Sequence, residues 1–252
     1  MTEVEMEYIH AKRKGKKGKG KGHFSSFLQN NGTDSSASVA LPKDFEVAFK
    51  WVPVEGLRIS SGKNKVIYEE YKQVRADLLK ETVYNPDGTE NKEGISRLRQ
   101  AGLNDKAIYE TVGKGKTPNG YNYHHLFPRV LSGSLAKGPI QLGDEKISSI
   151  HDWRCLMPLP NSTNKDIHMN VHKAMEERNG PLPPEGFKTT YYIAMPLSSK
   201  EYEMYRQNPK SVKAELLIVS GKDYRTVDQR DNAPAKTMSV ADIARMKMAK
   251  GR

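Results

Sequence analysis

The chain has 252 residues, with 41 Lys or Arg against 30 Asp or Glu, and a formal net charge of +11 at pH 7. This length fits one large domain or two small ones, and a hydrophobic content of 36% is enough for a core of ordinary size. The charge excludes an acidic solvating protein and favours a nucleic acid or another anion as partner.

The single cysteine, Cys155, excludes an internal disulfide framework and a cysteine-based zinc finger. It lies in an apolar stretch, which favours a core residue over a nucleophile. The N-terminus reads MTEVEME and lacks both regions of a secretory signal peptide. No stretch approaches the roughly 18 apolar residues of a membrane helix. We therefore expect a cytoplasmic protein at synthesis, exported only if a specialised secretion system delivers it into target cells.

Residues 12–21 read KRKGKKGKGK, with seven basic residues and three glycines. Such a segment cannot enter a core, so residues 1–40 are predicted to form a disordered basic arm. The arm is either a solvated tail that aids solubility or a non-specific binder of phosphate backbones. A second basic stretch, residues 92–129, holds seven Lys or Arg against three Asp or Glu. It leads directly into a pair of histidines.

Apolar periodicity and turn residues predict a series of short elements. In the first half these are a strand at 45–49, a helix at 66–83, short helices at 94–102 and from 103, and a strand at 121–127. Beyond residue 184 they are strands at 189–195 and 212–219, a helix with a capping box at 198–206, and a basic helix at 239–250. The alternation indicates an α+β fold.

Four of the seven histidines form an informative pattern. His124 and His125 are adjacent on a predicted strand, so their side chains should point to opposite faces. His168 and His172 are four residues apart on a helix predicted at 164–178, with Thr163 and Asp166 as its capping pattern. Two imidazoles on one helix face suit a divalent metal, and one strand histidine can join them while the other acts on a substrate.

Each pair alone is more often incidental than functional. Together, with a turn before the strand and a capped helix behind it, they indicate a site.

Residues 97–130, RLRQAGLNDKAIYETVGKGKTPNGYNYHHLFPRV, resemble the entry to HNH nuclease domains of bacterial polymorphic toxins. The later I-H-x-x-x-H at 167–172 resembles the helix of colicin-type DNases. The resemblance covers about residues 94–178. It implies a ββα-metal (His-Me finger) nuclease core, in which a β-hairpin and a helix clasp one divalent ion. That core would be embedded in a larger mixed α/β domain, giving an α+β protein overall.

The resemblance also implies roles for the histidines. His125 matches the general base, His124 the metal ligand on the strand, and His168 and His172 the metal ligands on the helix. The family's central Asn has no counterpart in its usual place, because Trp153 or Arg154 stands there, before a strand predicted at 154–158. Residues 132–151 read as an insertion into the hairpin. In that insertion, His151 beside Asp152 has the residue types to orient a base, although a surface pair is the simpler interpretation.

The resulting division of the chain has four parts. These are the arm at 1–40, an N-terminal α+β region at 41–90 that packs on or docks the core, an HNH-like nuclease core at 91–180, and a C-terminal α+β extension at 181–252.

The sequence therefore predicts a metal-dependent endonuclease that hydrolyses DNA, with a bacterial toxin or effector as its context. Three imidazole ligands favour zinc or a nickel-like ion, with magnesium or manganese as alternatives. Arg129, Arg154 and Lys116 are candidate phosphate contacts. Expected partners are DNA or RNA and an acidic immunity protein. The competing hypotheses are an RNase on the same fold and a non-catalytic nucleic-acid-binding protein with a structural metal.

Overall fold

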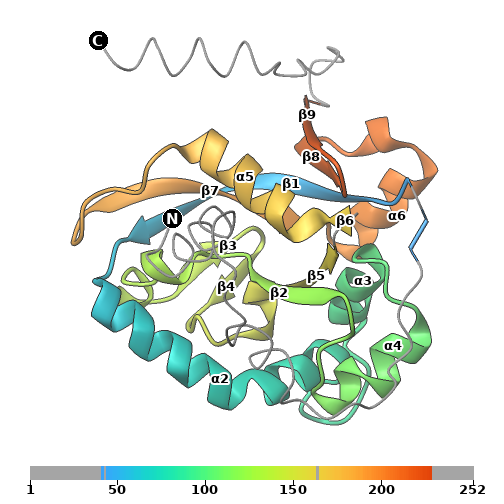
Figure 1. Ribbon diagram of the computed structural model, residues 1–252, viewed down its shortest axis with the longest axis horizontal. Coiled ribbons are helices and arrows are strands. Elements are labelled where there is room, and N and C mark those ends of the chain that lie inside the picture. The colour runs from blue at the N-terminus through green and yellow to red at the C-terminus, as the bar shows by residue number, and fades with distance from the viewer. Residues whose placement is uncertain (1–40, 43, 163–164, 229–252) are drawn as a thin grey trace, which may run out of the picture.

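The computed structural model describes residues 41–42, 44–162 and 165–228. The basic arm predicted at 1–40 and the helix predicted at 239–250 lie outside these residues. The described chain is a mixed α+β structure with antiparallel sheets (Figure 1). None of its helices combines the length and apolar character that crossing a bilayer requires.

The larger sheet has the strand order β7-β1-β8-β9. Its strands are β7 (Lys188–Pro196), β1 (Glu46–Leu57), β8 (Glu215–Ser220) and β9 (Tyr224–Asp228). Strand β1 pairs with β7 over its whole second half and with β8 over its first residues. Residues from the 41–90 and 181–252 regions thus form one continuous sheet around a central strand.

Strand β1 is buried on both faces at residues 47–49, which explains the apolar run there. Val47 and Phe49 belong to the main core, whereas Ala48 packs on the other face in a small cluster with Leu197 and Leu216. Helix α6 (Ser199–Gln207) carries Tyr202, which packs on this second cluster. The capping box predicted at the start of α6 is confirmed, with Ser198 and Glu201 as its reciprocal partners.

The smaller sheet has the order β2-β5-β6. Strand β2 (Tyr121–His125) pairs antiparallel with β5 (Leu156–Ser162), which pairs in turn with β6 (Lys165–Asp166). The prediction that β5 begins at Arg154 is wrong. The Asp152 side chain accepts a hydrogen bond from the Arg154 backbone N–H and caps a 3-10 turn, η4 (Trp153–Cys155), so the strand begins two residues later.

Between β2 and β5 the chain forms a hairpin of β3 (Ile140–Leu142) and β4 (Glu145–Ile147), flanked by the 3-10 turns η2 (Arg129–Leu131) and η3 (Leu135–Lys137). Leu142 and Ile147, which lie within residues 132–151, are completely buried in the main core. The segment read from sequence as an insertion is thus part of the core packing. Cys155, also completely buried, confirms the prediction of a core residue.

The remaining helices form the side of the molecule opposite β8 and β9, where α2 runs along the lower edge (Figure 1). They are α2 (Ser61–Val83), α3 (Lys92–Gln100) and α4 (Asp105–Glu110), with the 3-10 turn η1 (Val112–Lys114). The 3-10 turn η5 (Pro209–Ser211) instead lies against α6, before β8. Helix α2 begins five residues earlier than its apolar spacing predicts, because the Ser60 side chain accepts a hydrogen bond from the Lys63 backbone N–H and caps it.

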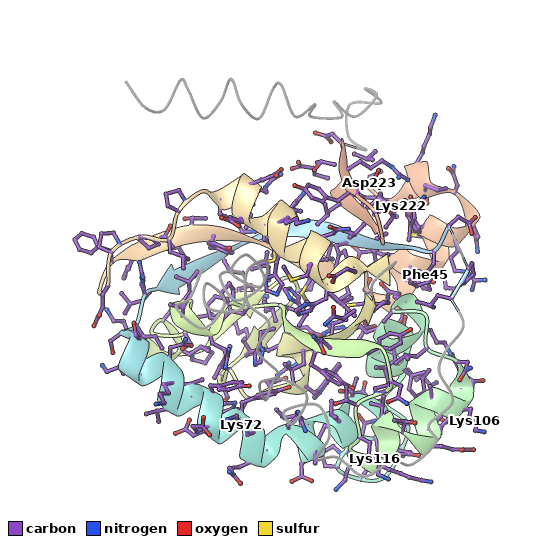
Figure 2. The ribbon with its side chains drawn as sticks, viewed as in Figure 1. Phe45, Lys72, Lys106, Lys116, Lys222 and Asp223 are labelled. Carbon is purple, nitrogen blue, oxygen red and sulfur yellow. The ribbon has the colours of Figure 1, made fainter. Side chains whose placement is uncertain are left out.

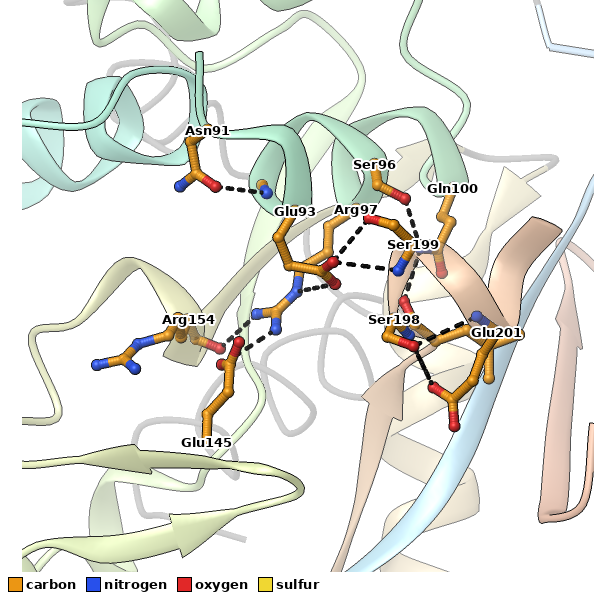
Figure 3. Close-up of polar contacts among 12 residues, drawn as sticks. Asn91, Glu93, Ser96, Arg97, Gln100, Glu145, Arg154, Ser198, Ser199 and Glu201 are labelled. Carbon is orange, nitrogen blue, oxygen red and sulfur yellow. Dashed lines mark hydrogen bonds and ion pairs between the residues drawn. The ribbon is translucent and has the colours of Figure 1, made fainter. Parts of the chain in front are cut away.

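Arg97 on α3 ties several of these elements together (Figure 3). Its side chain is 4% exposed, and its guanidinium donates to the backbone carbonyl of Arg154 at 3.0 Å and to Glu145 on β4 at 3.4 Å. Glu93, one turn before Arg97, accepts from the Ser199 backbone N–H at 3.1 Å and hydroxyl at 2.7 Å. These bonds fix α3 against the hairpin, the η4 turn before β5, and α6.

We expect Arg97→Met to lower the free energy of unfolding by about 2 kcal/mol, since it leaves the partly buried Arg154 carbonyl and the partly exposed Glu145 carboxylate without their donor. Arg99→Met on the same helix is the matched control. Arg99 is 53% exposed and pairs with Asp105 at 3.0 Å, so its loss should change stability by less than about 1 kcal/mol. Urea denaturation of both variants measures the difference. Equal losses would contradict a special role for Arg97.

Candidate metal centre and histidine site

Strand β2 separates its two histidines, as the side-chain alternation of a strand predicts. His124 points toward α5 (Ile167–Asn179) and is 1% exposed. The His125 side chain instead meets α2, with its ring centroid 4.7 Å from that of Tyr71 in an edge-to-face arrangement. The two adjacent imidazoles therefore lie in different environments on either side of the sheet.

Helix α5 presents His168 and His172 one turn apart. Its N-cap is Asp166, whose side chain accepts a hydrogen bond from the Met169 backbone N–H. The helix therefore begins at Ile167, later than predicted, and Thr163 lies outside the described residues. The helix ends before Gly180, as the sequence predicted. The φ of Gly180 is 69°, a conformation that glycine adopts readily and that other residues adopt only with strain.

The larger sheet holds α5 in place, so its histidines have a fixed position. The Arg178 guanidinium lies 4.7 Å from the Trp51 ring centroid and 4.5 Å from that of Tyr192, and it pairs with Glu215. Asn170, in the middle of the helix, donates to the Ser220 carbonyl at 3.0 Å. Helix α5 thus contacts strands of both sheets.

The structure brings together all three predicted metal ligands. Nδ1 of His124 lies 3.2 Å from Nε2 of His172, and the His124 ring centroid lies 5.6 Å from that of His168. His168 and His172 have ring centroids 4.7 Å apart. One nitrogen from each ring falls within 4.8 Å of the others, a spacing that a single ion can bridge.

Electrostatics favour neutral rings for two members of this histidine triad (His124, His168 and His172), namely His124 and His168. Burial lowers the pKa of His124 well below its ordinary value, and the neighbouring His172 and His168 lower it further. Burial also lowers the pKa of His168 to about 3, with His172 contributing. Neutral imidazoles are the form in which histidine binds metals, so His124 and His168 need not lose protons at pH 7.

The residues fit a resident metal ion on a further ground. One nitrogen of His124 faces His172, and the other, Nε2, is buried with no hydrogen-bond partner among the described residues. A buried polar atom without a partner is unfavourable, and a metal bond at this ring would satisfy one of its nitrogens. Three nitrogen donors suit zinc or a similar transition ion better than magnesium. Asp166, the nearest acidic residue in sequence, caps α5 instead.

His125 has the surroundings of a neutral base. Burial lowers its pKa well below the ordinary value, and the charge of Arg129 is the next largest cause, followed by that of His151. Its Nε2 atom is buried without a hydrogen-bond partner in the part of the chain that the structure describes. The ring is therefore uncharged at pH 7, and its Nε2 atom is not engaged by another described residue.

The three candidate phosphate contacts have different surroundings. Arg129 is close enough to His125 for its charge to act on that ring, and its guanidinium stacks 4.5 Å from the Tyr68 ring centroid. Arg154 is held by Asp152 through Nε at 2.9 Å and Nη2 at 2.6 Å. Lys116 is exposed, near the lower edge of the view with Lys106 (Figure 2). Arg129 has the placement most suited to a phosphate at His125.

Sequence analysis missed the contribution of α2, whose contributing residues lie about 50 positions before β2. Tyr68, Tyr71 and Glu70 from this helix reach Arg129, His125 and His151 respectively. Polar and aromatic residues at positions 64, 68, 71 and 75 share one face of this helix. A polar face that is turned toward the protein is unusual, and this pattern is the signal in the sequence. His151 was expected to form a surface pair with Asp152. It contacts Glu70 instead, because Asp152 binds Arg154.

Comparison with known proteins found no matching family model, curated protein or solved structure. The described residues thus define a mixed α+β protein with a candidate three-histidine metal centre, and a fourth histidine on the other side of the same strand.

Lowering the pH from 7 to 5 should destabilise the metal-free protein. This range lies above the one in which most carboxylates titrate. Between pH 7 and 5 the unfolded chain gains protons at its histidines, whose pKa is near 6.5, while the buried rings stay neutral. The unfolded state then binds more protons, so stability falls with pH. For His168 alone the loss at pH 5 is about 2 kcal/mol.

Urea denaturation in EDTA at the two pH values measures this loss. A His168→Leu variant should show a smaller loss than the wild type. Stability that is equal or higher at pH 5 would contradict buried, neutral histidines.

Proposed function

We propose that this protein is a metal-dependent endonuclease with a ββα-metal core formed by β2, β5 and α5. The observation that supports this most is the division of the histidines. His124 gathers with His168 and His172 within bonding range of one ion, while His125 stands apart beside Arg129. A purely structural metal site has no use for a separate, neutral, half-buried histidine next to an arginine.

In this proposal the triad holds one divalent ion, which when bound supplies positive charge to stabilise the negative charge of the phosphoryl transition state and leaving oxygen. His125 accepts a proton from the attacking water, a role for which its ring must be neutral. Arg129 binds a non-bridging phosphate oxygen near His125, and its stacking on Tyr68 limits the motion of its guanidinium.

The proposed substrate is DNA. The net charge of +11 favours a polyanion, and residues 92–129, with seven Lys or Arg against three Asp or Glu, lead directly into His124. Phosphate contacts carry no sequence information, so cleavage should be largely non-specific. RNA offers the same phosphodiester chemistry and is the alternative that the first assay must separate.

A bacterial toxin or effector is the biological role that we propose for such an enzyme. Its producer would need protection from cleavage of its own DNA. A basic enzyme is best blocked by an acidic partner, because opposite charge accelerates and orients association. We therefore propose an acidic immunity protein as partner, and delivery by a specialised secretion system.

The experiment is to incubate the purified chain with supercoiled plasmid and, separately, with RNA, each with Mg²⁺, Mn²⁺, Ni²⁺ or Zn²⁺ and with EDTA. The proposal predicts that a transition ion supports plasmid nicking and EDTA abolishes it. Arg206→Ala, which removes a 63% exposed residue paired only weakly with Glu203 at 3.7 Å, should cleave like the wild type.

Cleavage of RNA alone would replace DNA by RNA as substrate. Salt-sensitive DNA binding without cleavage under any metal would overturn the nuclease proposal in favour of a binding protein.

A further inference from the structure

Helix α2 packs along the face of β2 that carries His125. Tyr123 lies on the same face, because residues two apart on a strand point to the same side. The ring centroids of His125 and Tyr71 are 4.7 Å apart, and Tyr123 packs on the small cluster that Tyr71 forms with Leu156 of β5. The contact between α2 and the smaller sheet therefore surrounds the proposed base.

Two polar atoms at this contact are buried without a protein partner. The Tyr123 hydroxyl and Nε2 of His125 each lack a hydrogen bond among the described residues. Folded proteins satisfy nearly all buried polar atoms with protein groups, water or a ligand. This face can therefore still pair with a polar molecule.

Two arginines lie on either side of Tyr71 along α2. The guanidinium of Arg129, from η2, is 4.5 Å from the Tyr68 ring centroid, and the rings of Tyr68 and Tyr71 stack with centroids 6.5 Å apart. Arg75 lies one turn beyond Tyr71 on the same helix face, because residues four apart on a helix are neighbours. The order along α2 is thus Arg129 at Tyr68, His125 at Tyr71, and then Arg75.

The charge of Arg75 has no acidic partner. Its side chain is half-buried and forms no hydrogen bond or ion pair within the part of the chain that the structure describes. Six other arginines of this part pair with carboxylates, namely Arg97, Arg99, Arg154, Arg178, Arg206 and Arg225. Burial raises the pKa of Tyr71 to about 12, and the charges of Arg75 and Arg129 both oppose that rise. Two cations thus act on the ring that touches His125.

We propose that Arg75 is a substrate-binding residue, which binds a backbone phosphate next to the one bound by Arg129, so that the nucleic-acid strand runs along α2 past His125. This inference rests on the proposed function. A guanidinium binds phosphate through two parallel hydrogen bonds, and Arg75 breaks no ion pair to do so. Because the two arginines lie on either side of Tyr71, they suit neighbouring phosphates of one strand better than a single phosphate.

Other cations on α2 are less available. Lys72 lies 4.6 Å from the Tyr68 ring centroid, but it pairs with Glu69 at 2.8 Å. Lys80 pairs with Asp77 at 3.1 Å. A role for Arg75 in packing alone is the alternative, because the long side chain of arginine can cover apolar surface. That alternative predicts a loss of stability and no specific loss of DNA binding.

The test measures DNA binding apart from cleavage. Fluorescence anisotropy of labelled duplexes in EDTA gives the dissociation constant at several salt concentrations. Arg75→Gln should weaken binding by about 10-fold, equally for duplexes of unrelated sequence, and should reduce the dependence of log affinity on log salt concentration by about one unit of slope. Arg75→Lys keeps the charge and should keep the slope.

Arg206→Gln is the matched control, because it removes the same charge from a 63% exposed residue on α6. It should bind DNA like the wild type. Where metal supports cleavage, Arg75→Gln should raise KM by about 10-fold and change kcat by less than about twofold, since a contact made equally in substrate and transition state affects KM alone. The midpoint of urea unfolding is measured for each variant.

An Arg75→Gln protein that binds DNA as tightly as the wild type, or no more weakly than Arg206→Gln, would overturn the inference. So would a loss of binding that follows unfolding and is equally large in Arg75→Lys. Failure of the proposed function gives a different result: wild-type protein binds DNA but cleaves no nucleic acid with any metal. The anisotropy measurements then still report whether Arg75 contacts a phosphate.

Discussion

Replacing His125 with alanine should lower the rate of DNA cleavage by about 10²- to 10⁴-fold, the usual contribution of a general base. The loss should fall on kcat, because His125 acts on water and not on the bound metal. The ring lies on the face of β2 opposite the triad, so metal affinity should remain within about twofold of the wild type. Quenched-flow cleavage of a labelled duplex and calorimetric metal titration measure the two quantities.

Two controls separate this effect from simple damage. The His125 ring packs on Tyr71, so the unfolding midpoint of His125→Ala must be measured, and the assay run well below that midpoint. Tyr71→Phe keeps the ring that supports His125 and should retain most activity. A His125→Ala protein that is folded, binds metal and cleaves at the wild-type rate would exclude His125 as the base.

Loss of a triad ligand should have the other large effect, on metal binding itself. His172→Ala should weaken zinc or nickel binding by at least about 100-fold, since changing even an outer partner of a metal ligand costs 10- to 100-fold. In the wild type, metal at 100 times its dissociation constant should add about 2.7 kcal/mol to the stability, which raises Tm by roughly 5–10 °C. Thermal melts with metal and with EDTA check both statements.

The matched control for the triad is His151→Ala, because His151 lies outside the group of three ring nitrogens within 4.8 Å of one another. It should bind one metal ion per chain with wild-type affinity and show the same rise in Tm. A wild-type melt that metal leaves unchanged, or a His172→Ala protein that binds as tightly as the wild type, would contradict the triad as the metal site.

Local patterns in the sequence predicted how each pair of histidines is arranged on its own element, whereas the meeting of strand and helix was an expectation from the resemblance to HNH nucleases. The alternation of a strand separates His124 from His125, and the spacing of a helix aligns His168 with His172. Both rules depend only on residues within one element. The same is true of the capping box at Ser198 and of the α5 stop at Gly180, which the structure confirms.

The surroundings of His125 could not be predicted in this way. Tyr71 and Glu70 come from a helix whose position is set by tertiary packing, and no local pattern relates that helix to β2. His151 was assigned to its neighbour Asp152, but Arg154 takes both oxygens of that carboxylate through a tighter two-point contact. The pairing of β1 with β7 and β8 likewise joins residues more than 130 positions apart.

The most direct test of the account is the single-turnover nicking of supercoiled plasmid by protein that carries one equivalent of metal, compared with the same protein after EDTA treatment and after metal is restored. The account predicts nicked and then linear plasmid with the metal-loaded protein, no cleavage after EDTA, and full recovery on readdition. Protein that binds one metal ion through the triad, remains folded and leaves the plasmid intact would contradict it.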